Sequence, residues 1–165
     1  MLLTFTRRFI GLWILVLIQV LILDDITLFG YATPFLYSYL LLKLDANLSR
    51  YSLLIWGFFL GLAVDLFLNT PGVNAGATTL LAFMRPTILK LYMPRDAAED
   101  LIPGVKSMDT GPFLRYVITA VSIHITVLNL LLSFSLAYPL DMFIRIVSST
   151  LLTSLIIWAV DRARS

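Results

Sequence analysis

The sequence predicts an all-α membrane protein: a polytopic bundle of six helical spans, in which residues 1–165 form a single integral membrane domain. Three observations support this fold class. The chain is 59% hydrophobic and 13% charged, with a mean hydropathy of +0.92, and is therefore far more apolar than a soluble domain. Apolar runs close to membrane-spanning length recur along it. Lys and Arg gather in alternate connections between these runs.

Several of the six expected spans are shorter than the ~20 residues that a perpendicular membrane helix needs, and helix-breaking residues interrupt the second one. Thr33 and Pro34 resemble an N-cap followed by a first-turn proline, so the helix of this span is expected to begin near Pro34, after an irregular stretch that contains Gly30. Short or broken helices are tolerated where neighbouring protein covers their backbone polar groups, which favours a compact bundle. The spans are expected at residues 9–23, 26–42, 53–68, 73–92, 113–136 and 140–160.

The basic residues predict the orientation of the chain. With six crossings, ten of the twelve Lys and Arg residues fall in segments on one side, whereas residues 24–25, 69–71 and 136–139 on the other side carry none. Positive charge in short loops stays cytoplasmic, so both termini and the connection 93–112 are expected in the cytoplasm. That connection is either a solvated linker or a docking site for a cytoplasmic partner. The ten residues are Arg7, Arg8, Lys43, Arg50, Lys90, Arg95, Lys106, Arg115, Arg162 and Arg164.

Glycines spaced four residues apart mark the third expected span and the turn after it. Gly57, Gly61 and Asp65 share one helical face, and this glycine spacing lets membrane helices approach closely. A carboxylate in the outer part of a span needs a partner. Asp65 is therefore either a capping carboxylate that holds the turn or one member of a buried ion pair. The packing residues expected here are Gly57, Gly61, Asp65, Asn69, Pro71, Gly72 and Gly76.

Two basic residues fall inside expected spans. Arg145 follows Asp141 by four residues, so the two side chains can pair along one helix. Both lie near the expected depth of Asp65, which makes an intramembrane ion-paired cluster of Asp65, Asp141 and Arg145 sterically feasible. Arg85 lies nearer the cytoplasmic end of its span, and its long side chain is expected to snorkel to the headgroups.

A polar stripe follows the fifth expected span with the period of about 3.5 residues that is typical of a helix seam. Such a face indicates packing against another helix through hydrogen bonds, although a water-lined ligand path has the same pattern. His124 points roughly the opposite way and is interpreted as a packing or hydrogen-bonded residue. The stripe consists of Thr119, Ser122, Thr126, Asn129 and Ser133.

Sequence motifs of enzymes are missing from the chain. It has no Cys, which excludes disulfides and thiol chemistry, and it lacks the G-x-S-x-G, H-E-x-x-H and Walker-type patterns. Its basic residues are single or paired loop charges and form no stripe that could follow a nucleic-acid backbone. We therefore expect no enzymatic activity, no cofactor or metal, and no nucleic-acid partner. Transport stays open, because ionisable residues in membrane helices often mark a substrate path.

Residues 57–76 closely resemble the signature of the rod shape-determining protein family MreD. In that family a glycine-spaced helix carries an aspartate and then turns through small residues into the next helix. Residues 82–86 and 94–96 also resemble one branch of the family. The resemblance covers Asp65 and its glycines as motif positions only, with no chemical role attached to them.

This resemblance implies a non-enzymatic scaffold of the bacterial cell-wall elongation machinery, with several spans in the cytoplasmic (inner) membrane, that helps to maintain rod shape. The implied partners are membrane lipid, the single-span coiled-coil protein MreC, filaments of the actin-like MreB, and the peptidoglycan glycosyltransferase and transpeptidase pair. The implied fold is similar to the substrate-binding component of energy-coupling-factor transporters. The alternative function is accordingly a small-molecule-binding transporter component that uses Asp65, Arg145 and the polar stripe as ligand contacts.

Overall fold

Every element of secondary structure longer than a single bridge residue is helical in the part of the chain that the computed structural model describes. The described residues are 2–23, 27, 30–94, 101–133 and 139–164, with side chains described from residue 10 onward. The elements are α1 (Leu2–Ile18), the π-helical turn η1 (Gln19–Leu23), α2 (Ser38–Leu42), α3 (Arg50–Leu68), α4 (Val73–Tyr92), α5 (Val105–Met108), α6 (Thr110–Ser133) and α7 (Pro139–Arg164).

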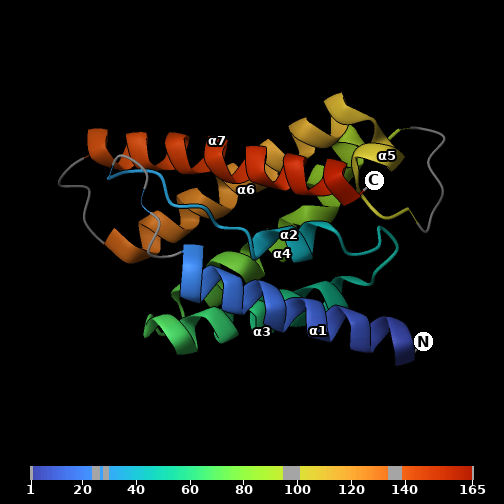
Figure 1. The fold of residues 1–165 in the computed structure, drawn as a ribbon, viewed down its shortest axis with the longest axis horizontal. Helices are drawn as coiled ribbons and strands as arrows, with labels where there is room; N and C mark the ends of the chain where they lie inside the picture. The colour runs from blue at the N-terminus through green and yellow to red at the C-terminus, as the bar shows by residue number, and fades with distance from the viewer. Residues whose placement is uncertain (1, 24–26, 28–29, 95–100, 134–138, 165) are drawn as a thin grey trace.

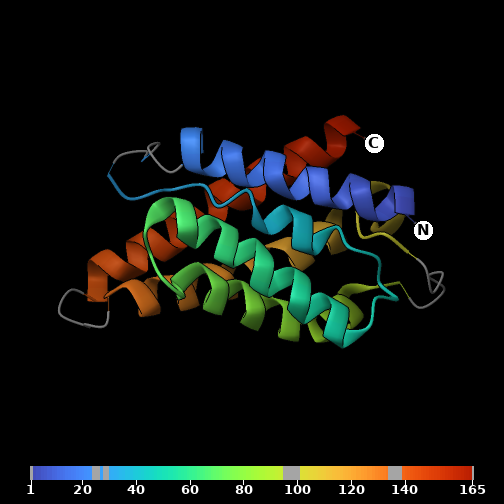
Figure 2. The same ribbon diagram turned by 90° about the horizontal axis from the view of Figure 1, so that it is seen from below.

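The long helices α1, α3, α4, α6 and α7 run lengthwise through the molecule (Figures 1 and 2). Both termini and α5 lie at one end, which we call the termini end. The turn between α3 and α4, residues 69–72, lies at the other end, which we call the turn end. The chain termini and the α3–α4 turn therefore lie at opposite ends of the molecule.

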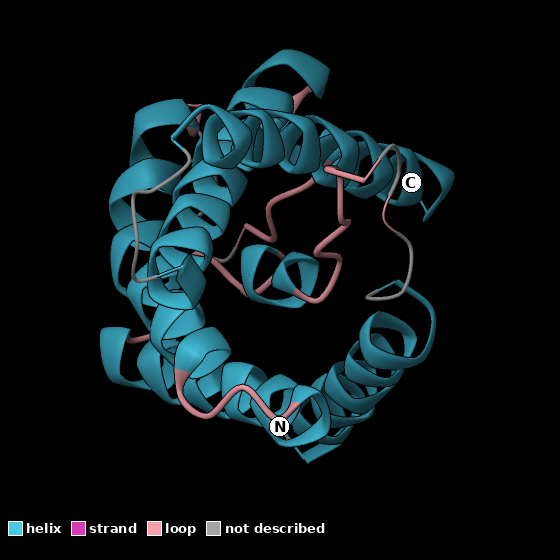
Figure 3. Cartoon of the chain, turned by 90° about the vertical axis from the view of Figure 1, so that its left-hand side faces the viewer, coloured by secondary structure: helices cyan, strands magenta, loops and turns pink. Residues whose placement is uncertain are grey.

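The long helices surround α2 and the loop before it, as the view along the bundle shows (Figure 3). Helix α3 packs on α4, α4 on α6 and α6 on α7, while α1 packs on α3. Tyr37, Leu41 and Leu42 are completely or almost completely buried, so this short segment forms the centre of the core. Among the described residues, α1 and α7 do not pack closely on each other.

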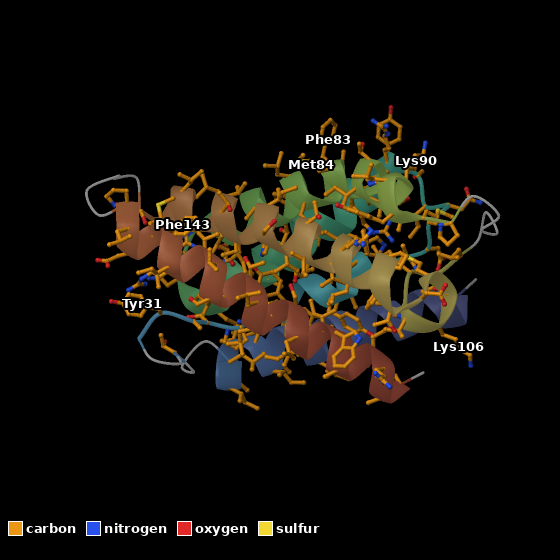
Figure 4. All side chains as sticks on the ribbon, turned by 90° about the horizontal axis from the view of Figure 1, so that it is seen from above. Tyr31, Phe83, Met84, Lys90, Lys106 and Phe143 are labelled. Atoms are coloured by element: carbon orange, nitrogen blue, oxygen red, sulfur yellow. The ribbon has the colours of Figure 1, made fainter. Side chains whose placement is uncertain are left out.

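The outer surface of the bundle is apolar. Three of the described helices, α3, α6 and α7, are long and apolar enough to cross a membrane. Large side chains such as Leu66 and Leu91 are more than two-thirds exposed, and Figure 4 shows the exposed Phe83 pointing away from α4. Apolar exposure of this extent marks a surface that contacts lipid or another protein. The chain is thus a helical membrane protein.

In its described part, the second expected span, residues 26–42, is an irregular stretch followed by a helix, as expected, but the helix is shorter than predicted. Its helix is limited to Ser38–Leu42 and begins after Pro34 rather than at it; residues 24–26 and 28–29 lie outside the described part. The preceding backbone is not helical, and other segments satisfy its polar groups. Gln19 donates to the Pro34 carbonyl (2.9 Å) and accepts from the Leu36 N–H (2.9 Å). The described part of this segment therefore contains no helix long enough to cross a membrane.

Two side chains of α7 complete the hydrogen bonding of this extended segment. The Thr33 N–H donates to Ser149 Oγ (3.1 Å), and the Phe35 N–H donates to Thr153 Oγ1 (3.0 Å). Backbone groups buried away from water must find such partners. The remaining expected spans overlap α1–η1, α3, α4, α6 and α7. The fourth has the same bounds as α4, and residues 134–136 of the fifth lie outside the described part.

Candidate functional site

The glycines of α3 allow its backbone to lie directly against α4. A β-carbon placed on Gly57 would lie 2.8 Å from both Ala82 Cβ and the Thr78 carbonyl oxygen. One placed on Gly61 would overlap Thr78 Oγ1 and the Asn74 carbonyl oxygen. The structure therefore brings the two helices together along the spaced glycine face, as this motif does in membrane proteins.

The turn between α3 and α4 requires two residues with positive φ. Asn69 ends α3 with φ 55°, and its N–H bonds to the Asp65 carbonyl. Gly72 precedes α4 with φ 85°, a conformation that costs glycine little. Pro71 is exposed between them. Gly76 is not part of the α3 contact, because a β-carbon there would lie 3.3 Å from Leu131 Cδ1 of α6.

The Asp65 carboxylate caps the first turn of α4. Its Oδ1 accepts from the Asn74 N–H (2.9 Å), Asn74 Nδ2 (3.0 Å) and Thr70 Oγ1 (2.9 Å), and its Oδ2 accepts from the Ala75 N–H (2.9 Å). A negative group at a helix N-terminus satisfies N–H groups that lack intrahelical partners and opposes the helix dipole. Asp65 is only 3% exposed, so the capping interpretation matches its surroundings.

The structure does not form the expected cluster of Asp65, Asp141 and Arg145. Asp141 and Arg145 are both exposed on the first turns of α7. Arg145 makes no ion pair with Asp65, whose oxygens accept from neutral donors. The physical reason is that the turn itself supplies enough donors for the buried carboxylate. Arg145 instead lines a cavity of about 240 Å³ at the turn end, together with Asn129 of the polar stripe.

A buried hydrogen-bond network continues from Asp65 across the core. Tyr37 donates to Asn74 Oδ1 (2.8 Å) and also contacts His124 Nε2 (2.8 Å). Because Asn74 Nδ2 donates to Asp65, Asn74 Oδ1 must accept from Tyr37, and His124 Nε2 must then donate to the Tyr37 oxygen. The network joins α3, α4, α6 and the segment before α2. Tyr37 could not be identified from sequence, because it lies in the second expected span and is not part of a polar stripe like the one along α6.

The polar stripe of α6 bonds mainly to its own helix. Ser122, Thr126 and Asn129 donate to the carbonyls of Thr119, Ser122 and Ile125, respectively. Thr119 makes a hydrogen bond to another helix, at 3.0 Å from the hydroxyl of Tyr92 in α4. Helix α6 does pack on α4, but most of its hydrogen-bonding capacity is used along α6 itself.

Arg85 does not snorkel, which corrects the expectation from the sequence. It is completely buried, and its guanidinium donates to the carbonyls of Leu42, Leu44 and Asp45. Leu42 is the last residue of α2, and Leu44 and Asp45 follow it closely; the C-terminal end of a helix presents unsatisfied acceptors and a partial negative charge. Arg85 thus holds the short central helix from its C-terminal side.

Asp161 performs the corresponding role between α2, α5 and α7. Its carboxylate lies 2.5 Å from Lys43 Nζ and accepts from the Tyr39 hydroxyl (2.8 Å) and the Val105 N–H (2.7 Å). Asp161 is 3% exposed. Its role could not be predicted from sequence, because an Asp beside Arg162 at the end of a span has the pattern of a solvated helix end.

The site is a set of polar anchors within a helical membrane protein. No group of three or more His, Cys, Asp or Glu residues that could hold a metal ion occurs among the residues described. In comparisons with known proteins, no protein-family model matches the chain, and neither a curated protein nor a solved structure matches it.

Proposed function

We propose that the protein is a non-enzymatic membrane scaffold of the bacterial cell-wall elongation machinery that binds MreC and helps to maintain rod cell shape. The observation that carries this proposal is that the buried charged side chains bind other parts of the same chain. Asp65, Arg85 and Asp161 each bind the ends of the chain's own helices. A catalytic or ligand-binding group must instead be free to meet its substrate.

The partner assignment rests on the likeness of residues 57–76 to the MreD signature. In the structure these residues are the α3–α4 hairpin, with close helix contact and a capped turn. A rigid hairpin of this kind suits a protein that presents fixed helix faces to other membrane proteins. MreC, MreB filaments and the peptidoglycan glycosyltransferase and transpeptidase are the partners proposed, in the cytoplasmic membrane.

A second candidate function, the small-molecule-binding component of a transporter, is favoured by the cavity at the turn end. The cavity has a volume of about 240 Å³. Its lining includes three polar side chains and one cationic side chain: Thr70, Asn74, Asn129 and Arg145. It is smaller than the range of about 300–1,000 Å³ that is typical of drug-sized ligands. Both Asn74 and Thr70 are already bonded to Asp65, so we rank this function second.

Purification in a mild detergent, followed by mass spectrometry of the protein and small-molecule fractions, separates the two functions. The scaffold proposal expects MreC to co-purify with the intact protein and expects no small molecule in stoichiometric amount. A stoichiometric small molecule that is lost in Arg145→Gln and retained in Arg115→Gln, without a protein partner, would establish the transporter component instead. Arg115 is a matched exposed arginine outside the turn-end cavity.

The proposed orientation places the termini end in the cytoplasm. Figure 4 shows Lys90 and Lys106 toward this end and Tyr31 and Phe143 toward the other, which agrees with the rule that positive loops stay cytoplasmic. Because the chain has no Cys, single-cysteine labelling is unambiguous. With an impermeant reagent on intact cells, Pro71→Cys should react and Ser107→Cys should not; both positions are exposed. Labelling of Ser107→Cys alone would reverse the orientation.

A further inference from the structure

A large cavity opens between α1 and α7 near the termini end. Its volume is about 1110 Å³, and α1 contributes Gly11, Ile14, Leu15 and Ile18 to one wall. The segment around α2 contributes Leu36 and Leu40, so this part of the cavity is apolar. Since α1 and α7 do not pack closely on each other in the described part of the chain, the cavity opens on the flank of the bundle between these two helices.

The other part of the cavity carries charge. Lys43, Lys106 and Arg164 line it together with Asp45 and Asp161, which leaves an excess of one positive charge. The Asp161 carboxylate is already used by Lys43, Tyr39 and Val105. Lys106 and Arg164 are exposed, and Figure 4 shows Lys106 at the outer edge of the bundle. The cationic groups therefore lie where a helix end would meet lipid headgroups.

We propose that this cavity binds an anionic phospholipid, with its phosphate at Lys106 and Arg164 and an acyl chain along the wall formed by α1 and α2. An apolar wall that ends in a basic edge complements the chemistry of such a lipid, and basic pockets between membrane helices are known to bind anionic headgroups. A partner's membrane helix fits less well, because an apolar helix would cover Lys106 and Arg164 without supplying a counter-charge. The inference does not depend on the scaffold function.

Native mass spectrometry tests the headgroup part of the proposal. The protein is released from bilayer nanodiscs of equimolar phosphatidylglycerol and phosphatidylcholine, and the retained lipid is identified. The wild type should retain phosphatidylglycerol preferentially, and the Lys106→Gln, Arg164→Gln double variant should lose roughly 25-fold of that preference, since each basic residue near the surface contributes about 1 kcal/mol. The control pair Lys90→Gln, Arg115→Gln removes two exposed charges that do not line the cavity and should keep the preference.

A photo-crosslinker at Ile14 tests the position. Ile14 is 52% exposed and lines the cavity, whereas Leu66 is 75% exposed on α3 and does not line it. We expect a crosslinker at Ile14 to capture phosphatidylglycerol over phosphatidylcholine, and one at Leu66 to capture both lipids equally. The proposal is overturned if the double variant and the control pair retain lipid alike, if Ile14 shows no lipid preference, or if Ile14 captures a protein partner in place of lipid.

Discussion

Replacing Gly61 with Leu is expected to lower the free energy of unfolding by about 3 kcal/mol, because added volume in a close-packed interior commonly costs about 1–3 kcal/mol and occasionally more. A β-carbon at this position would overlap the Asn74 carbonyl and lie 2.5 Å from Ala75 Cα. Both are backbone atoms of α4 and cannot rotate away. The two helices must separate, and the hydrogen bonds between Asp65 and the start of α4 are then strained as well.

Gly11→Leu is the matched control for this variant. A β-carbon on Gly11 would lie 3.4 Å from Leu40 Cδ1, which is an ordinary contact with the end of a flexible side chain. Thermal unfolding in detergent and the monodisperse fraction on size-exclusion chromatography measure both variants. We expect Gly61→Leu to melt at a clearly lower temperature than Gly11→Leu. Equal melting temperatures would show that the close contact of α3 with α4 is not important for stability.

The α3–α4 hairpin could be predicted from sequence because its determinants are local. The spaced glycines, Asp65 and the small-residue turn lie within twenty consecutive positions, residues 57–76. Helix spacing places Gly57, Gly61 and Asp65 on one face, and a turn with Asn and Gly accommodates positive φ. Whether Asp65 capped the turn or joined an ion pair could not be decided, since both need a buried carboxylate at the same depth.

The length of the non-helical segment before α2 and its hydrogen bonding could not be predicted, because its partners are remote in the chain. Thr33 and Phe35 bond to Ser149 and Thr153, which lie 116 and 118 residues away. An apolar run with Gly and Pro is compatible with a kinked membrane helix as well as with an extended segment whose backbone is satisfied by other helices. Only the packing of α7 and η1 against this segment selects the second arrangement.

The buried charges of the termini end were hidden for a related reason. Arg85 lies five residues before Lys90 in an apolar helix, a pattern that suits snorkelling, yet its acceptors are carbonyls 40–43 residues earlier. Asp161 is similarly tied to Tyr39 and Lys43, which are far away in sequence. The length of a charged side chain and its position in a span do not distinguish an exposed charge from a buried one. The position of α2 in the centre of the bundle decides it, because α2 supplies the partners of Arg85 and Asp161.

Asp65→Ala is expected to destabilise the protein by about 3–5 kcal/mol, because it leaves two buried backbone N–H groups and the half-buried Thr70 hydroxyl without their acceptor, and a buried unsatisfied donor costs roughly 1–3 kcal/mol. The two N–H groups are those of Asn74 and Ala75, whereas the Asn74 amide keeps Thr70 Oγ1 as an acceptor at 3.1 Å. Asp65→Asn should be intermediate, since it keeps one acceptor oxygen but loses the charge and places an NH₂ group near a donor. Unfolding curves in detergent give the free energy of unfolding of the wild type and of both variants.

Arg145→Met distinguishes this capping role from an ion pair. Arg145 is exposed and makes no ion pair with Asp65 in the structure, so its replacement should change the free energy of unfolding by no more than about 0.5 kcal/mol, as is usual for surface positions. A buried pair would behave differently: loss of either partner leaves an uncompensated charge and costs about 3–5 kcal/mol. If Arg145→Met proved as damaging as Asp65→Ala, the carboxylate would depend on the arginine rather than on the α4 N-terminus. A mild Arg145→Met beside a severe Asp65→Ala assigns Asp65 to the turn.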